Sequence, residues 1–248
     1  MDQPRFQRFQ HFAAARAISG LWSALSARIP RRCLFCEQSG VPDGTCASCA
    51  AALPWNEVSC VLCAQPLPTA IAAHRCSRCS THPPHFDHIV APFRYEAPIQ
   101  PLIHALKYRA RFDYADWLGE RIAAAVINRP EPLPECLIPV PLHASRLRLR
   151  GYNQARELAR GICRRLQIPI EQRRIIRKLA TPDQIGRDAR ERARNVSKAF
   201  AAVAPLPFQH IAIVDDVVTT GSTVDAVAAV CRAAGASRIE VWCAARAP

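Results

Sequence analysis

The sequence predicts an α/β domain with a mostly parallel sheet, preceded by a small metal-binding module. Three observations lead to this fold class. Cys-x-x-Cys pairs crowd residues 33–79, segments typical of strands and helices alternate from Ile89 onward, and the apolar run Ile211–Val214 leads into a small polar loop. Alternating strands and helices are typical of a parallel sheet with covering helices. The 248 residues, 50% of them hydrophobic, suffice for one or two domains with a substantial core.

The chain is strongly basic, with a formal net charge of +13 and a sequence pI of about 9.6. Much of the excess lies between Arg146 and Lys198, where few acidic residues oppose the arginines. A polyanionic partner suits such a surface, and a solvated basic surface without a partner is the alternative. No run of about eighteen apolar residues occurs, so no transmembrane segment is expected.

Residues 1–32 are predicted to form an amphipathic leader helix, because apolar residues recur near helical spacing among arginines. Arg16 interrupts any hydrophobic core of a signal peptide, so we expect no secretion signal and a cytoplasmic protein. We interpret this segment first as a helix that packs against the rest of the same chain, or as a partly disordered leader. Docking on an anionic membrane or on a partner is the alternative.

Four Cys-x-x-Cys pairs define the next segment, residues 33–80. Two such pairs supply the four thiolates of a tetrahedral Zn²⁺ site, so the sequence predicts two structural zinc ribbons. We expect the first two pairs to share one ion and the last two the other, with an interleaved pairing as the alternative. Disulfides are not expected without export, and four copies favour structural metal over redox activity. The expected ligands are Cys33, Cys36, Cys46, Cys49, Cys60, Cys63, Cys76 and Cys79.

Three histidines, His82, His85 and His88, follow the last cysteine pair. The two prolines between them prevent a helix, and the cysteines already complete the zinc ligands. We therefore interpret this stretch as a linker into the main domain, residues 88–248, with His74 as an alternative zinc ligand.

The first half of the main domain alternates strand and helix. Ile89–Tyr95 is typical of a strand, Pro98–Tyr108 of a short helix and Tyr114–Ile127 of a longer helix. A proline-rich loop precedes the predicted strand Leu137–Val140. The loop after that strand leads into a helix over Ala155–Leu166, whose apolar residues share one face.

The second half centres on the strand Ile211–Val214, which we expect to stop at Asp215 and Asp216 because charge replaces the apolar run. A hydroxyl-rich loop and an amphipathic helix follow. Gly235 is expected to end this helix, and Arg238–Ala244 supplies the last strand. The isolated cysteines are expected to be small core residues, namely Cys136, Cys163, Cys231 and Cys243.

The loop Thr219–Thr223 has the character of a phosphate site, because a helix entered through it directs N–H groups and its positive dipole end into the loop. The adjacent Asp215 and Asp216 suit a ribose cis-diol or a hydrated Mg²⁺. We therefore expect a ribose 5-phosphate as the combined ligand. The structural alternative is a capping box of Ser222 with Asp225. The sequence has neither a Walker motif nor a dinucleotide-binding glycine motif at this loop.

The segment Val214-Asp-Asp-Val-Val-Thr-Thr-Gly-Ser-Thr223 resembles the binding signature for 5-phosphoribosyl 1-pyrophosphate (PRPP) in type I phosphoribosyltransferases. Further segments narrow the resemblance to the ComF family of competence-associated phosphoribosyltransferase-like proteins, which also carry N-terminal cysteine knuckles. The resemblance covers residues 33 to the end. The segments are His104–Tyr108, Arg150–Ala155, Thr181–Gln184 and Arg192–Val196 with Phe200.

The resemblance implies a type I phosphoribosyltransferase domain and roles for its site residues. Asp215 and Asp216 would hold the ribose hydroxyls of PRPP, which binds with Mg²⁺. Positive charges at the pyrophosphate or phosphate are expected from Arg148, Arg150 and Lys107. The alternative is that the two arginines are ordinary solvent-exposed surface residues. The 5-phosphate would bind to Thr219, Thr220, Gly221, Ser222 and Thr223.

Two classes of function follow from these expectations. An enzyme would transfer the pentosyl group of PRPP to an acceptor, and any hood over the site must come from the zinc ribbons or residues 168–198. The alternative is a non-catalytic accessory protein of DNA uptake in natural transformation, regulated by PRPP. It would bind single-stranded DNA through Arg156, Arg160 and Arg164. DNA-uptake or recombination proteins are the expected partners, and zinc ribbons that dock a protein partner are a third possibility.

Overall fold

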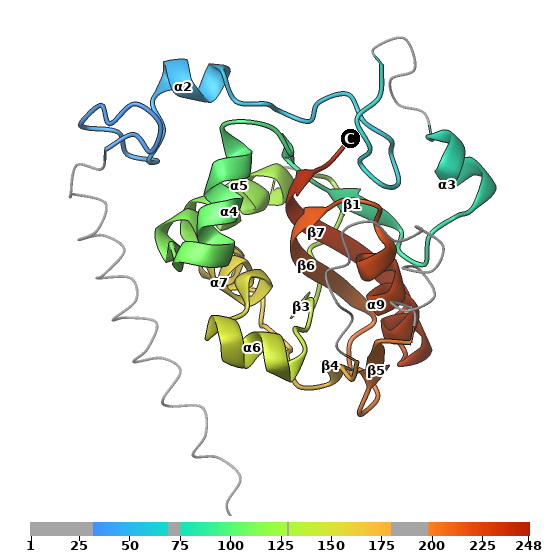
Figure 1. The fold of residues 1–248 in the computed structure, drawn as a ribbon. Coiled ribbons are helices and arrows are strands. Elements are labelled where there is room, and N and C mark those ends of the chain that lie inside the picture. Colours follow the sequence, from blue (N-terminus) through green and yellow to red (C-terminus); the bar gives the residue numbers. More distant parts are fainter. Residues whose placement is uncertain (1–31, 69–74, 128, 180–197) are drawn as a thin grey trace, which may run out of the picture. The chain divides into compact units, whose positions relative to one another are not determined.

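The computed structural model of the protein (Figure 1) describes residues 32–68, 75–127, 129–179 and 198–248. The chain divides into two compact units, Met1–Ala52 and Leu53–Pro248. The predicted leader, except Arg32, lies outside the described residues, as does His74. The domain boundaries expected from the sequence stay predictions. In the described part of the chain, none of the helices has the length and apolar character that a membrane crossing needs.

The described part of the first unit holds the first two cysteine pairs and the short helix α2 (Ala47–Ala51). Its buried cluster consists of Cys33, Val41 and Cys46, with Phe35 and Cys49 packed against it. Three of these five side chains are cysteines. So small an apolar cluster cannot offset the entropy of ordering the chain, which is why a metal is expected here.

A parallel sheet organises the second unit. Its strand order is β1-β7-β6-β3, and β2 lies beside the end of β7. The central strands β6 and β7 are buried along most of their length, because helices cover both faces of the sheet. The strands are β1 (His88–Val90), β2 (Phe93–Arg94), β3 (Cys136–Pro139), β6 (His210–Val218) and β7 (Arg238–Arg246).

The helices lie on the two faces of this sheet. Figure 1 shows α4, α5 and α7 on one side and α9 on the other. Helices α5 and α7 pack closely at Gly119 and Gly161, where a Cβ on Gly119 would come within 2.9 Å of the Leu158 carbonyl oxygen. The predicted helices are therefore confirmed as α4 (Ile99–Arg109), α5 (Phe112–Ile127), α7 (Gln154–Leu166) and α9 (Ser222–Ala233).

The central strand is longer than predicted. The expectation that Asp215 and Asp216 end it was wrong, because β6 continues to Val218. Strand β7 runs beside it to Arg246, so hydrogen bonding between the two strands continues beyond the apolar residues. Charge alone does not end a strand when a neighbouring strand still supplies hydrogen-bond partners.

Smaller differences also have physical reasons. The predicted strand over residues 89–95 is split into β1 and β2 around Pro92, which has no N–H for a ladder. Two elements were not predicted from the sequence: the short helix α6 (Ala144–Arg150) and the hairpin formed by β4 (Ile175–Arg177) and β5 (Phe200–Ala202). Of the four isolated cysteines, Cys163 is half-buried on α7, whereas the other three are fully buried.

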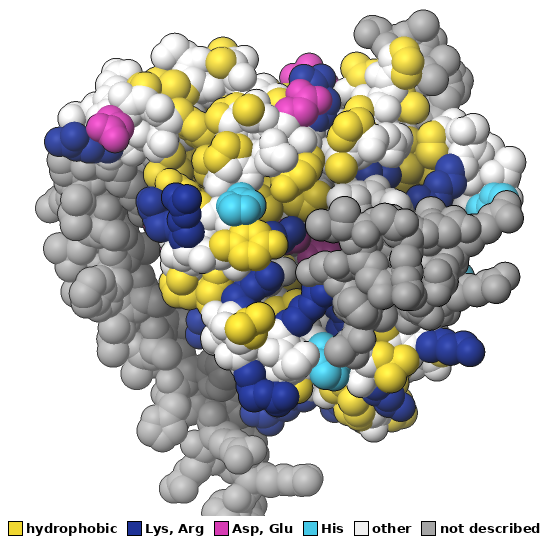
Figure 2. Space-filling model, in the orientation of Figure 1, with side chains coloured by type: hydrophobic (Ala, Val, Ile, Leu, Met, Phe, Trp, Pro, Cys, Tyr) yellow, Lys and Arg dark blue, Asp and Glu magenta, His cyan; other side chains and the backbone are white. Residues whose placement is uncertain are grey.

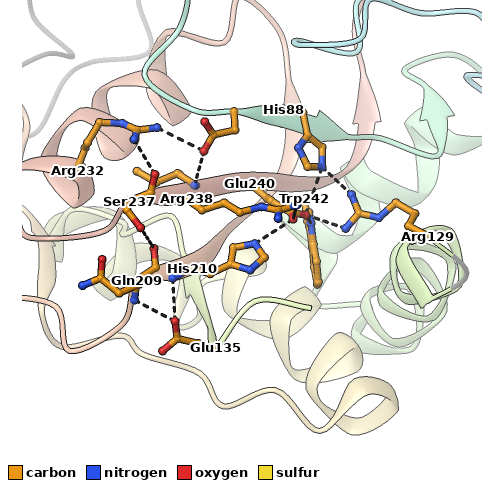
Figure 3. Close-up of polar contacts among 12 residues, drawn as sticks. His88, Arg129, Glu135, Gln209, His210, Arg232, Ser237, Arg238, Glu240 and Trp242 are labelled. Atoms are coloured by element: carbon orange, nitrogen blue, oxygen red, sulfur yellow. Dashed lines mark hydrogen bonds and ion pairs between the residues drawn. The ribbon is translucent and has the colours of Figure 1, made fainter. Parts of the chain in front are cut away.

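Glu240 is a completely buried carboxylate near the start of β7 (Figure 3). It accepts hydrogen bonds from Trp242 Nε1 at 2.7 Å, Arg129 Nη2 at 2.8 Å and His210 Nε2 at 3.0 Å, and His88 Nε2 lies 3.3 Å away. Burial alone would raise the pKa of Glu240, but these partners hold it well below its usual range. The cluster closes the amino-terminal edge of the sheet, opposite the edge where the carboxyl ends of the strands meet.

Candidate functional site

The eight knuckle cysteines form two sets of four sulfur atoms. Cys33, Cys36, Cys46 and Cys49 make one set, and the last two pairs make the other, with all four Sγ atoms of each set within 4.8 Å of one another. Four thiolates about 2.3 Å from a tetrahedral Zn²⁺ would be about 3.8 Å apart. The Cys36–Cys46 and Cys63–Cys76 sulfur distances are both 3.6 Å. The donor sets therefore fit zinc, and the sequential pairing of the knuckles is confirmed.

Backbone N–H groups favour the thiolate form of two of these cysteines. The N–H of Cys46 points at Cys33 Sγ at 3.5 Å, and the N–H of Cys76 points at Cys60 Sγ at 3.3 Å. Burial opposes ionisation, but such N–H donors lower the pKa of Cys33 to about 6 and that of Cys60 to about 7. A thiolate is the form of cysteine that binds Zn²⁺, so Cys33 and Cys60 favour it, whereas hydrogen bonds with neighbouring thiols raise the pKa of Cys49 to about 12.

Two carboxylates lie at the carboxyl-terminal edge of the sheet. Asp216 is buried, and its Oδ2 lies 3.1 Å from the Lys107 ammonium on α4. Asp215 is half-buried, and its Oδ1 accepts the N–H of Asp216 at 2.9 Å. Burial and the neighbouring charge of Asp216 raise the pKa of Asp215 to about 7, although Lys107 opposes the shift. The two carboxylates therefore differ in their surroundings: Asp216 pairs with Lys107, whereas half-buried Asp215 carries the raised pKa.

The loop Thr219–Thr223 joins β6 to the start of α9. Gly221 is the N-cap residue, has a φ of +80° and supplies no side-chain cap, and the Ser222 N–H makes a long hydrogen bond of 3.4 Å to Thr220 Oγ1. The alternative capping box of Ser222 with Asp225 is not formed, because Asp225 Oδ1 instead accepts the N–H of His85 at 2.7 Å. The first N–H groups of α9 thus keep the orientation that suits an anion.

The stretch interpreted as a linker from the sequence packs against this loop. The His85 ring lies 3.2 Å from Asp225 Oδ1, and the Arg78 guanidinium donates a hydrogen bond to the carbonyl of Thr220. A cavity of about 260 Å³ lies between the second cysteine set, at Cys63 and Cys79, and the loop. The stretch leads directly into β1 and also packs beside the loop, since proline excludes a helix but does not exclude packing.

A basic pocket of about 360 Å³ lies beside Lys107. Arg150 lines it too, with its guanidinium 5.5 Å from the centre of the Tyr108 ring and bound to Gln154 Oε1 at 2.6 Å. Figure 2 shows Lys and Arg side chains clustered over the region of α4 and α6. Two of the three predicted phosphate-binding cations thus share one pocket, whereas Arg148 is exposed on α6 and does not line it. The other lining residues are Arg109, Ala110, Arg146, Leu149 and Tyr152.

The arginines predicted to bind nucleic acid lie along α7. Arg160 pairs with Glu157 at 3.0 Å, and Arg164 pairs with Asp116. Arg156 is exposed on the same helix. None of the three lines the basic pocket, so their role as a nucleic-acid surface stays a prediction.

Sequence reasoning missed three residues around the loop: Arg78, His85 and Arg246. Arg246 is 3% exposed and reaches the loop from the end of β7. A signal existed for Arg78 and His85, because their cysteine- and proline-rich stretch is followed at once by the first strand of the sheet. Arg246 has no local pattern that distinguishes it from a surface arginine.

Residues 24–80 match the family model of the double zinc ribbon domain. DNA utilization protein YhgH of Escherichia coli (strain K12) is 34% identical over 207 residues, which cover 82% of this chain and 90% of that protein. Competence protein F of Haemophilus influenzae is 32% identical over 225 residues, which cover 87% of this chain and 97% of that protein.

A solved structure of purine phosphoribosyltransferase from Pyrococcus horikoshii matches 58% of this chain and 71% of that chain, at 19% identity and a TM-score of 0.28. The expected architecture, a parallel α/β sheet with an N-terminal double zinc ribbon, is confirmed by the strand order and the two cysteine clusters. Given its similarity to competence protein F and YhgH over nearly their whole lengths, the chain belongs to the ComF family.

Proposed function

We propose that this protein binds PRPP with Mg²⁺ at the carboxyl edge of its sheet, in the service of DNA uptake or utilization. The process is proposed because the relatives are a competence protein and a DNA utilization protein. One observation supports the ligand most directly: half-buried Asp215 adjoins the Lys107–Asp216 pair on the strand that leads into the loop and the start of α9. This arrangement offers an acceptor for ribose hydroxyls on the same segment as two proposed sites for phosphate groups.

Each part of PRPP has a proposed contact. Asp215 accepts hydrogen bonds from the ribose hydroxyls, and the N–H groups of the loop 219–223 surround the 5-phosphate. Lys107 and Arg150 face the pyrophosphate, where their positive charges compensate its negative charge. Mg²⁺, when bound, neutralises the same group further.

The same contacts suit pentosyl transfer. As pyrophosphate leaves, positive charge develops on the ribose ring and negative charge on the departing oxygens. Asp215 lies on the side of the ribose, and Lys107 and Arg150 on the side of the leaving group. We propose this chemistry as a consequence of binding, and a screen of nucleobases for pyrophosphate release tests it.

The binding proposal is tested by calorimetric titration of the zinc-loaded protein with PRPP and Mg²⁺. Asp215→Asn keeps the shape of the side chain but removes its charge, and we expect affinity to fall by about tenfold or more. Asp113→Asn is the matched control, since Asp113 is an exposed carboxylate on α5 that pairs with Arg111. Equal PRPP affinity in wild type and Asp215→Asn would overturn the assignment.

A second candidate function is binding of single-stranded DNA in the basic pocket. The observation that favours it is the mixture of cations with exposed apolar and aromatic surface: Tyr108 is 64% exposed and Leu149 is 91% exposed. Bases stack on aromatic rings while phosphates contact Lys and Arg, which makes such binding strongly dependent on salt.

This candidate is tested by fluorescence anisotropy with a labelled oligothymidylate at several salt concentrations. We expect Tyr108→Ala to weaken binding by about tenfold, because loss of one stacked base contact is worth about 1–3 kcal/mol. Arg164→Gln is the comparison on α7, where the side chain is already paired with Asp116. Weaker binding only in Arg164→Gln would assign the DNA to α7 and contradict the pocket.

A further inference from the structure

Arg246 connects the second zinc ribbon to the phosphate loop. The residue ends β7, and only 3% of its surface is exposed. Its Nε donates to the carbonyl oxygen of Cys63 at 2.9 Å, and its Nη1 donates to that of Val218 at 3.1 Å and also to that of Thr219. One buried guanidinium therefore holds a zinc-ligating residue and the start of the loop together.

The chemistry of these contacts makes the connection tight. Arg246 also donates to Gln65 Oε1, beside the knuckle, and to the carbonyl of Ala247. All of these acceptors are uncharged oxygens, so dipoles rather than a carboxylate compensate the buried charge. If either the second zinc ribbon or the loop moved, the guanidinium would lose hydrogen-bond acceptors. Because Arg246 is buried, water would not replace them.

Arg78 makes a second connection. It lies on α3 (Ser77–Thr81), next to the ligand Cys79, and donates to the carbonyl of Thr220. Together, the two arginines bind the carbonyl groups of Val218, at the end of β6, and of the loop residues Thr219 and Thr220.

This orientation decides where the loop N–H groups point. Among the described residues the only cis peptide bond is Ala97–Pro98, so the loop peptides are trans. In a planar trans peptide the N–H points opposite to the C=O that precedes it. With these carbonyls turned to the two arginines, the N–H groups of residues 219–221 point away from the arginines, where they are free to face a phosphate.

We propose that Arg246 is a positioning residue that couples zinc at Cys60, Cys63, Cys76 and Cys79 to phosphate binding by the loop. The inference rests on the proposed binding of PRPP, which supplies the phosphate. Coupling between two sites is reciprocal: zinc at this site raises the affinity for PRPP, and PRPP raises the affinity for zinc by the same factor.

The reciprocal effect is measured by competition for zinc with a chromophoric chelator, at fixed Mg²⁺, with and without PRPP. In a Cys49→Ser variant only the second site is complete, and in a Cys79→Ser variant only the first. We expect PRPP to raise the zinc affinity of the second site by about fivefold or more, the lower end of typical coupling. The first site is the internal control and should not respond, because it takes no part in these contacts.

The role of Arg246 is tested with Arg246→Lys, which keeps the charge but loses the planar fork of donors. We expect its PRPP affinity to fall by about fivefold or more and the response of zinc affinity to PRPP to disappear. Arg174→Lys is the matched control, because Arg174 also donates to a backbone carbonyl, that of Pro205 at 2.6 Å. Arg78→Lys is an exposed second variant, used if circular dichroism shows that Arg246→Lys does not fold.

Hydrogen exchange of the amides in residues 219–222 gives a readout that needs no ligand. We expect faster exchange in Arg246→Lys and in Cys79→Ser than in wild type and Arg174→Lys. If wild type does not bind PRPP, the proposed function fails, and unchanged exchange in both variants would then overturn the coupling as well. If wild type binds PRPP and the Arg246 and Arg78 variants bind it equally well, the coupling is wrong while the proposed function stands.

Discussion

At the scale of single residues, the two neighbouring aspartates show how burial divides their roles. Asp216 is buried with Lys107 as its ion-pair partner, whereas half-buried Asp215 has a pKa raised to about 7 by burial and by Asp216. The sequence presents them as a matched pair. Only their different surroundings separate the buried, ion-paired Asp216 from the half-buried Asp215.

The raised pKa predicts a pH dependence of ligand binding. Below pH 7 Asp215 takes up a proton, and the neutral acid is a weaker acceptor for ribose hydroxyls. We expect PRPP affinity to fall as the pH is lowered from 8 to 6, by up to about tenfold per pH unit below the pKa. The measurement is calorimetric titration across this range. Asp215→Asn should retain only the titration of PRPP itself, and an identical pH profile in this variant would contradict the prediction.

The same shift affects stability with a definite sign. Between the ordinary pKa of 3.8 and about 7 the folded protein holds a proton on Asp215 that the unfolded chain releases. The contribution of this group to the free energy of unfolding therefore falls as the pH rises through that window. Urea unfolding should show that the wild-type protein loses this part of its free energy of unfolding between pH 4 and pH 7. Asp215→Asn should not show this loss.

The depressed pKa of Glu240, at the other edge of the sheet, predicts the opposite dependence of stability on pH. Its folded pKa is depressed, so its stabilisation is present above its ordinary pKa of 4.5 and is lost as the pH falls below that value. Glu240→Gln leaves Arg129 without its buried partner, and we expect a loss of about 3 kcal/mol in the free energy of unfolding at pH 7. Urea unfolding measures it. PRPP affinity of the folded variant should be unchanged, because the cluster lies away from the loop.

At the scale of elements, close helix packing depends on small residues. Helices α5 and α7 meet at Gly119 and Gly161, with the Gly161 Cα 3.0 Å from where a Cβ of Gly119 would lie. The apolar spacing of the sequence predicts both helices but not their contact. Periodicity shows which face of a helix is buried, whereas the distance between two helices depends on which residues meet.

Gly119→Ala should therefore destabilise the protein. The added methyl group would meet backbone atoms of α7, which cannot move without separating the helices, and we expect a loss of about 1–3 kcal/mol. Thermal and urea unfolding measure the change. Ala124→Ser, at an exposed position of α5, is the control and should change stability by less than about 0.5 kcal/mol. Equal stability of both variants would show that the helices tolerate a wider separation.

At the scale of the whole molecule, the two cysteine clusters belong to different compact units. The second cluster lies in Leu53–Pro248 together with the sheet, and its Cys60, Cys63 and Cys79 are part of the main buried core. The first cluster lies in the other unit. Zinc at the two sites should therefore stabilise different parts of the chain.

We expect loss of the second zinc to lower the melting temperature of the sheet-containing unit by about 5 °C or more. A change of 1 kcal/mol shifts a unit of this size by about 2–4 °C, and a structural zinc contributes more than that. Calorimetry of Cys79→Ser and Cys49→Ser tests it, with the larger shift of the main transition expected in Cys79→Ser. An equal shift in both variants would show that the clusters are not energetically separate.

The sequence by itself determined the features that depend on local pattern. Cys-x-x-Cys spacing predicted two clusters, apolar periodicity predicted α4, α5, α7 and α9, and the loop 219–223 lies between a strand and a helix as expected. The tertiary structure alone decided which distant residues meet. Lys107 reaches Asp216, and Arg246 reaches Cys63 from 183 residues away. The order of strands in the sheet brings such distant residues together, and burial strengthens the hydrogen bonds that they form. Neither effect leaves a signal in the local sequence.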